Sequence, residues 1–250
     1  MISLANSYSV YDPFARIYNE YYANREETMQ LLEMLQLPHL TQEAHILDLG
    51  CGTGQVAQLL LKKGYKVTGL DESDGMLHYA RKNAPGANFI LGDIRYFELP
   101  STFDGVISTG SSLNHILSLE ELKGVFHNVY TAMLENGLFL FDLYLEEYFQ
   151  SENDSMIAGD VKDEYVWGAR ASYHVEEKIS QTKVTIFELL KENWQRLDIT
   201  MLMKSYSREE VQSALENVGF TEVSIYNAER LFEKSGTAGE VYFVCRKPLS

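Results

Sequence analysis

The chain has 250 residues, and 21 Lys and Arg residues against 36 Asp and Glu residues give it a formal net charge of −15. Its hydrophobic fraction of 45% is ordinary for a globular protein and argues against a disordered chain. The acidic excess disfavours a surface that binds nucleic acid or an anionic membrane. Two cysteines are too few for a disulfide framework. Because neither a secretory leader nor a membrane span is visible, we expect a cytoplasmic protein.

Strands and helices alternate through the first part of the chain. In order, the pattern predicts a helix over 24–36, a strand over 45–49, a helix over 56–64, a strand over 65–70, a helix over 74–83, strands over 88–91 and 103–108, a helix over 119–134 and a strand over 137–144. Strands that alternate with helices of about ten residues are typical of βαβ units around a parallel sheet.

The pattern changes after residue 145. Residues 146–164 are acidic, and we expect them to be irregular. The remaining elements predicted are antiparallel strands over 165–175, 178–188 and 192–204, a helix from Ser207 to Gly219, and closing strands over 221–226 and 240–246. We therefore predict one α/β domain with an antiparallel flap inserted before its last helix.

A glycine-rich turn carries the strongest functional signal. It reads Gly-Cys-Gly-Thr-Gly over 50–54, where a strand passes into a helix and free backbone N–H groups can hold a ligand. A dinucleotide fingerprint needs a glycine at position 55, where Gln55 stands. Asp71 ends the next strand and can accept both hydroxyls of a ribose. An ordinary tight turn would explain the glycines, but not Asp71 and Asp93 in register with them.

These features resemble the class I S-adenosylmethionine-dependent methyltransferases over residues 44–145. The resemblance implies S-adenosyl-L-methionine as the cofactor. It also implies a Rossmann-like, doubly wound sheet of seven strands, six parallel and the last antiparallel, with the β flap inserted. The residues that the resemblance places on the cofactor are Tyr11, Tyr18, Gly50, Cys51, Gly52, Asp71, Glu72, Met76, Asp93, Ile94 and Thr109.

The sequence of the loop over 108–115 gives information about the class of methyl acceptor. It has neither the Pro-Pro motif of enzymes that methylate nucleic-acid bases nor the metal-binding Asp of catechol-type enzymes, so we expect no nucleic acid and no metal. It is similar to the loop of glycine N-methyltransferase and related small-molecule enzymes, through Gly110, Ser112 and His115. Where the glycine enzyme carries an Arg that grips the substrate carboxylate, this chain has Tyr144, which argues against glycine as the acceptor.

Methyl transfer from a sulfonium requires alignment and desolvation more than a strong base. The candidate catalytic residues are His115, Tyr144 and Tyr18. The candidate substrate-binding residues are Ser111, Asn114, Tyr144, Trp167 and Arg170. A structural role for His115, a core position for the flap aromatics and a solvated Arg170 stay open as alternatives.

We expect a single domain over 1–250. Its parts are an N-terminal helical lid over 1–43, a cofactor-binding core over 44–145, a flap over 146–206 above the acceptor pocket, and a closing segment over 207–250. The predicted function is methyl transfer to a small molecule, at nitrogen rather than oxygen. The alternatives are cyclisation or modification of the cofactor itself and a non-catalytic cofactor-binding module. A homodimer is compatible with the sequence.

Overall fold

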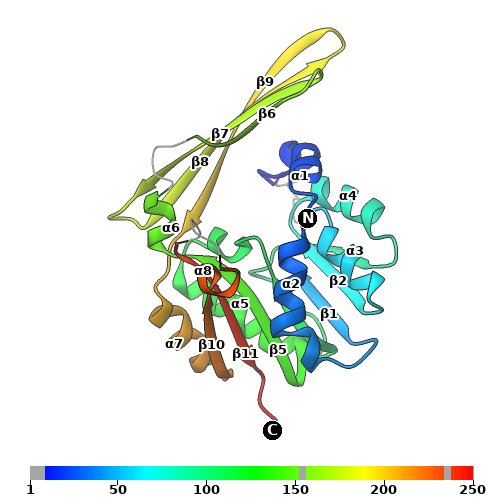
Figure 1. The fold of residues 1–250 in the computed structure, drawn as a ribbon, viewed down its shortest axis with the longest axis vertical. Helices are drawn as coiled ribbons and strands as arrows, with labels where there is room; N and C mark the ends of the chain where they lie inside the picture. The colour runs from blue at the N-terminus through cyan, green and yellow to red at the C-terminus, as the bar shows by residue number, and fades with distance from the viewer. Residues whose placement is uncertain (1–8, 152–155, 234–237, 250) are drawn as a thin grey trace, which may run out of the picture.

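In the computed structural model, which describes residues 9–151, 156–233 and 238–249, seven strands form the central sheet (Figure 1). In spatial order they are β3 (Asn88–Leu91), β2 (Lys66–Asp71), β1 (His45–Leu49), β4 (Phe103–Ser108), β5 (Met133–Tyr144), β11 (Glu240–Arg246) and β10 (Thr221–Asn227). Strand β11 runs antiparallel to both of its neighbours, and the other six strands are parallel. The predicted sheet is confirmed.

Helices cover both faces of this sheet. They are α1 (Ala15–Tyr21), α2 (Glu26–Leu35), α3 (Gln55–Lys62), α4 (Asp74–Asn83), α5 (Leu119–Ala132), α6 (Glu146–Ser151), α7 (Arg208–Val218) and α8 (Ala228–Leu231), with 3-10 turns η1 (Asp12–Phe14), η2 (Leu37–His39) and η3 (Ser112–His115). On β5, Phe139 and Phe141 pack in the core with α5 and α7, whereas Leu138 and Leu140 pack in the core with α2 and α3. Burial on both faces explains the unbroken apolar run of this strand.

A second sheet stands beyond the carboxyl ends of the parallel strands (Figure 1). Its four antiparallel strands are β6 (Met156–Val161), β7 (Tyr165–His174), β8 (Ile179–Leu190) and β9 (Asn193–Lys204). The three predicted strands are confirmed, but the expectation of an irregular segment over 146–164 is wrong, because α6 and β6 lie within it. Strand β6 is an edge strand that contains Gly159 and Asp160, so its pairing with β7 outweighs its own poor strand propensity.

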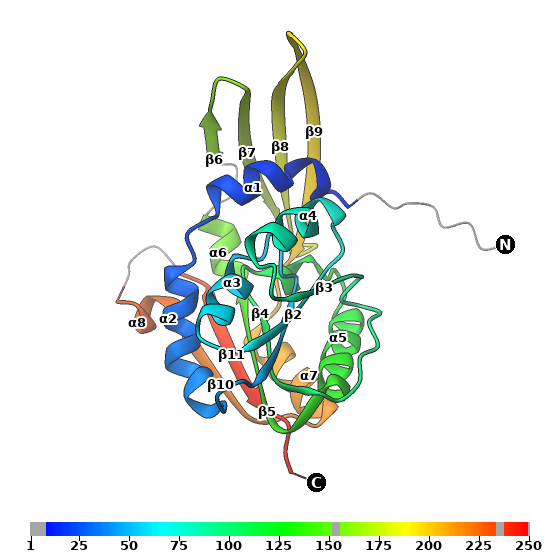
Figure 2. The same cartoon turned by 90° about the vertical axis from the view of Figure 1, so that its right-hand side faces the viewer.

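The N-terminal segment lies between the second sheet and helix α4 of the core. Phe14 and Ile17 share a buried cluster with Tyr165 and Trp167 of β7. Figure 2 shows α1 lying across the base of this sheet. The chain's beginning and its inserted sheet therefore meet above the carboxyl ends of β1, β2 and β4.

Two further elements bear on the predictions. Helix α7 begins with the predicted capping box, in which Ser207 and Glu210 satisfy each other's backbone N–H groups. The short α8 was not expected from the sequence. Within the described ranges, no helix is long and apolar enough to cross a membrane.

Candidate active site

The turn between β1 and α3 depends on its glycines. Gly50, Gly52 and Gly54 have φ values of +69°, +53° and +76°, in the left-handed region that L side chains rarely adopt. A Cβ on Gly50 would lie 2.6 Å from Ser112 Oγ, and one on Gly54 would lie 2.9 Å from the Cα of Ala80. The turn therefore brings its backbone close to η3 and α4, where a side chain would not fit.

Asp71, at the end of β2, is fixed by the same turn. Its Oδ2 accepts a hydrogen bond from the Gly52 N–H at 2.8 Å, and its Oδ1 accepts one from the Ser73 N–H at 2.9 Å. Burial raises the pKa of Asp71 to about 6, although these two backbone bonds lower it. Each carboxylate oxygen has a second acceptor position, so the side chain can still bind a pair of hydroxyls.

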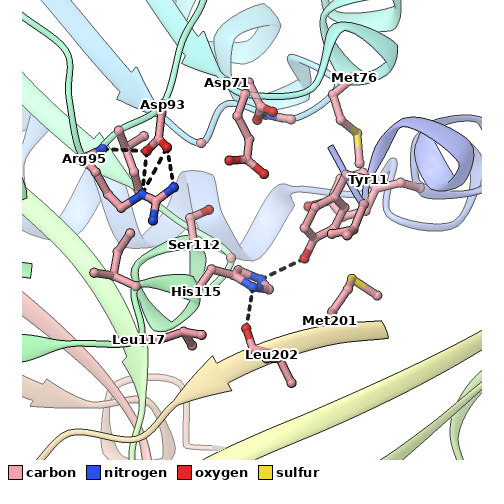
Figure 3. A pocket seen from close by; sticks show the side chains of 18 of the residues that line it. Tyr11, Asp71, Met76, Asp93, Arg95, Ser112, His115, Leu117, Met201 and Leu202 are labelled. Carbon is pink, nitrogen blue, oxygen red and sulfur yellow. Dashed lines mark hydrogen bonds and ion pairs between the residues drawn. The ribbon is translucent and has the colours of Figure 1, made fainter. Parts of the chain in front are cut away.

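A cavity of about 430 Å³ opens beside the turn, within the size range of small-molecule sites. Figure 3 shows how side chains from the N-terminal segment, the sheet and β9 converge on it. The predicted residues that line it are Tyr11, Tyr18, Gly50, Gly52, Asp71, Glu72, Met76, Asp93, Ile94 and His115. The structure thus brings ten of the predicted residues to one place.

Asp93 is held by a residue that the sequence did not single out. The Arg95 guanidinium donates to both Asp93 oxygens, with a shortest distance of 2.6 Å, and also to Glu121 Oε1 at 3.2 Å. Burial would raise the pKa of Asp93, but the hydrogen bonds and charge of Arg95 outweigh it and lower the pKa. Asp93 therefore presents a fixed, ionised carboxylate to the cavity.

His115 lies between Tyr11 and β9. Its Nδ1 is 2.9 Å from the Leu202 carbonyl oxygen, and its Nε2 is 2.8 Å from the Tyr11 hydroxyl. Because a carbonyl can only accept, Nδ1 carries the proton and Nε2 accepts from Tyr11. Burial lowers the pKa of His115 to about 4 despite the bond to Leu202, and it raises the pKa of Tyr11 well above its usual value. Both groups are neutral at pH 7.

The N-terminal segment is attached to the core by Asp12. Its Oδ1 accepts from the Ser73 hydroxyl at 2.6 Å and from the Gly75 N–H at 2.9 Å, at the start of α4. A Cβ on Gly75 would lie 2.9 Å from the Asp12 backbone, so this contact needs a glycine there. The attachment holds Tyr11 and Tyr18 over the cavity.

The side chain of Asn114 forms hydrogen bonds that join parts of the protein backbone. Its Nδ2 donates to the carbonyls of Tyr144 and Lys204 at 2.9 and 2.8 Å, and its Oδ1 accepts from the Tyr144 N–H. The side chain is fully buried and ties η3 to both sheets. Its hydrogen-bonding groups are thus engaged within the protein, and its effect on the cavity is to position the adjacent His115.

The remaining predicted residues lie off this cavity. Cys51 is buried beside Leu77 and Ala80, and the Ser111 N–H donates to Asp142. Trp167 is buried against Phe14 and Tyr21, its ring centroids 5.3 and 5.1 Å from theirs, and its indole N–H has no partner among the described residues.

Arg170 is exposed on β7, on the face opposite to Trp167. The structure brings neither residue to the cavity lining.

Thr109 and Tyr144 line a second cavity, of about 670 Å³, with Gly110 common to both cavities. The Tyr144 ring stacks on Tyr148 with centroids 3.7 Å apart. The other residues around the second cavity are Asn24, Arg25, Glu26, Glu27, Thr28, Gln30, Leu31, Asp142, Glu240 and Tyr242.

The comparisons with known proteins agree with this architecture. Residues 46–137 match the family described as a methyltransferase domain. The chain is 29% identical over 222 residues to the Bacillus subtilis protein named "Putative methyltransferase YqeM", and the match covers 84% of this chain and 86% of that protein. The chain therefore contains a methyltransferase domain, and it has the fold of an S-adenosylmethionine-dependent methyltransferase.

Other relatives of this methyltransferase are named for amino-sugar acceptors. It is 28% identical over 191 residues, 74% of this chain and 72% of that protein, to dTDP-4-amino-2,3,4,6-tetradeoxy-D-glucose N,N-dimethyltransferase of Saccharopolyspora spinosa. Its fold is similar to that of S-adenosylmethionine-bound CalS10, an amino pentose methyltransferase from Micromonospora echinaspora. That similarity has a TM-score of 0.70 at 20% identity and covers 92% of this chain and 96% of that chain.

The residues of this methyltransferase fit S-adenosylmethionine. The glycine turn offers a backbone surface that side chains would fill, and Asp71 and Asp93 are carboxylates suited to ribose hydroxyls and an adenine amino group. Met76 is buried and lines the same cavity. Among the residues described, no group of three His, Cys, Asp or Glu side chains could hold a metal ion.

Several residues of the cavity lining were not among the predicted site residues. They are Val10, Arg95, Ser112, Ile116, Leu117, Glu121, Thr200, Met201 and Leu202. Ser112 lies within the loop over 108–115 that was singled out for its similarity, and Ile116 directly follows that loop. Arg95, two residues after Asp93, had the spacing of a local ion pair. The flap was expected above the acceptor pocket, but the sequence did not indicate which β9 residues would face the cavity, because that depends on how the strand lies over the turn.

Proposed function

We propose that this methyltransferase transfers a methyl group to an amine nitrogen of a small molecule. The observation that carries the proposal is the geometry of His115 at the cavity wall, where Nδ1 donates to the Leu202 carbonyl and Nε2 accepts from the Tyr11 hydroxyl, so that neither ring nitrogen is free to take a proton from an acceptor. The amine acceptors in the names of the Saccharopolyspora and Micromonospora proteins support it.

The weak base argues against a hydroxyl acceptor. An alcohol must lose its proton as it attacks, and a base with a pKa of about 4 gives little driving force for that step. A neutral amine already carries a lone pair and reacts without such help. The charge of the cavity lining argues against a carboxylate acceptor, because four carboxylates, those of Asp71, Glu72, Asp93 and Glu121, line it against the guanidinium of Arg95.

S-adenosylmethionine, when bound, supplies an electrophilic methyl group. Asp71 and the glycine turn would hold its ribose and its methionine part, and Asp93 its adenine. The Tyr11 hydroxyl gives its hydrogen to His115, so the lone pairs of its oxygen remain available to an amine N–H at the cavity. The N-terminal segment and β9 would exclude water from the reacting groups.

An acceptor panel tests the proposal. We expect S-adenosylhomocysteine and an N-methylated product, followed by mass spectrometry, with small amines and not with matched alcohols or carboxylic acids. Methylation of carboxylic acids or alcohols alone would overturn it. Consumption of the cofactor without an acceptor would favour cyclisation or cofactor modification, and binding without turnover would favour a non-catalytic module.

Tyr11→Phe tests the role of the hydroxyl. We expect kcat to fall about tenfold, since one hydrogen bond of about 1.4 kcal/mol is lost at the reacting centre, while cofactor Kd changes less than about twofold. Tyr21→Phe, which alters a tyrosine outside both cavity linings, is the matched control. Equal losses of kcat and cofactor affinity in Tyr11→Phe would place this hydroxyl in cofactor binding instead.

A further inference from the structure

The second cavity is lined by carboxylates from three elements. Glu26 and Glu27 come from the start of α2, Asp142 from the end of β5 and Glu240 from the start of β11. The tyrosines of the same two strands, at positions 144 and 242, add aromatic rings to the wall. Carboxylates and tyrosine rings together are the surroundings that favour an organic cation.

Asp142 is the most buried of these carboxylates, with 5% of its surface exposed. It accepts from the backbone N–H groups of Gly110 and Ser111, at 3.1 and 2.9 Å. Within the described ranges, no Lys, Arg or His side chain forms an ion pair with it. Burial raises its pKa to about 7, against the lowering by these backbone bonds, so a cation beside it would displace a proton.

Arg25 lines the same cavity but lies against tyrosines. It donates to the Tyr18 hydroxyl at 2.7 Å, and its guanidinium is 5.5 and 5.9 Å from the ring centres of Tyr18 and Tyr22. In the part of the chain that the structure describes, it makes no ion pair with a carboxylate. Arg25 therefore leaves the charge of Asp142 unbalanced.

We propose that the second cavity binds the alkylammonium group of a small molecule, with Asp142 and Tyr144 as its principal contacts. This inference deepens the proposed function. It rests on that function in one respect, namely that the small molecule bound here is the methyl acceptor. Gly110 lines both cavities, and Tyr18, bonded to Arg25, lines the first, so the two sites adjoin at these residues. Because an alkylammonium nitrogen has no lone pair, a molecule held by its cation in the second cavity would present a different, neutral amine to the adjoining cofactor cavity.

Choline provides a probe that cannot be methylated at nitrogen. Titration calorimetry on the whole chain compares it with 3,3-dimethylbutan-1-ol, which has the same shape and no charge. We expect choline to bind at least tenfold more tightly and to release protons, seen as a buffer-dependent heat. Equal affinities for the two probes would overturn the inference.

Asp142→Asn keeps the size of the side chain and removes its charge. We expect choline affinity to fall at least tenfold while cofactor Kd is retained, and Glu209→Gln, an exposed carboxylate on α7, to leave choline binding unchanged. Retained choline binding in Asp142→Asn would contradict the assignment. If that variant does not fold, Glu240→Gln replaces it, with an expected loss of at least threefold. Charge-selective choline binding without amine methylation would refute the proposed function alone.

Discussion

The two cavities differ in what their walls are made of. Around the first, backbone conformation sets the shape, since Gly50 and Gly52 have positive φ and their missing Cβ atoms leave the space beside the turn. Around the second, side chains from α2, β5 and β11 set both shape and charge. A backbone-built site suits one constant ligand, whereas a side-chain wall can change its ligand by substitution. That division fits a shared cofactor and a variable acceptor.

The cavities also differ in which groups lie against the negative charges of their carboxylates. In the first, Arg95 neutralises Asp93 and contacts Glu121. In the second, Arg25 bonds to Tyr18, while Asp142 accepts from the backbone N–H groups of Gly110 and Ser111 and from the Ser111 hydroxyl, with no cation paired to it among the described residues. If this contrast is correct, changes in the first cavity act on the cofactor, and changes in the second act on the acceptor.

The largest expected effect is that of Asp71→Asn. Two hydrogen bonds from a carboxylate to ribose hydroxyls are worth about 1.5–3 kcal/mol each, so we expect cofactor Kd to rise at least about 100-fold. Calorimetry with S-adenosylhomocysteine measures it. Asp74→Asn, an exposed carboxylate at the start of α4, is the control. A change below threefold in Asp71→Asn would remove Asp71 from the ribose site.

The pH dependence of binding follows from the same carboxyl. Because its pKa is raised to about 6, Asp71 gains a proton as pH falls through that value and can no longer accept two hydroxyls. We expect cofactor Kd to be flat above pH 7 and to rise by up to about tenfold per unit below pH 6. Asp71→Asn removes this group, so a slope that persists in the variant would assign the titration to another residue.

Gly50→Ala has the next largest expected effect. A left-handed φ costs a non-glycine residue about 1–2 kcal/mol, and the added Cβ would contact Ser112. We expect the free energy of unfolding to drop by about 2 kcal/mol and cofactor Kd to rise about tenfold. In the control Gly124→Ala, on α5, the Cβ meets no atom within 4 Å, so stability should increase by up to about 1 kcal/mol. Unchanged cofactor binding in Gly50→Ala would show that the turn tolerates a side chain.

The sequence predicted the first cavity better than the second for a physical reason. Positive φ at Gly50 and a carboxylate after a parallel strand are local requirements, so residue type and spacing report them directly. The parallel sheet was also predictable, because burial on both faces leaves continuous apolar runs such as that of β5.

The parts of the site that the sequence did not predict depend on contacts between residues far apart in the chain. Met201 and Leu202 reach the cavity because β9 pairs with β8 and contacts η3, which no spacing in the sequence indicates. Asn114 reads as a polar loop residue, yet its amide joins Tyr144 and Lys204 from two different sheets. Asp142 and Glu240 line the same cavity because β5 pairs with β11, although 98 residues separate them in sequence.

The smallest expected effect, that of Tyr144→Phe, separates the two cavities most directly. The change removes one hydroxyl from the second cavity and keeps the ring that stacks on Tyr148. We expect acceptor KM to rise about threefold to tenfold, the value of one hydrogen bond, with cofactor Kd unchanged. Tyr65→Phe, a partly exposed tyrosine preceding β2 and remote from both linings, controls for a general effect of losing a hydroxyl. Parallel losses of acceptor and cofactor affinity in Tyr144→Phe would mean that the two cavities act as one site, because a residue confined to the second would then be controlling the first.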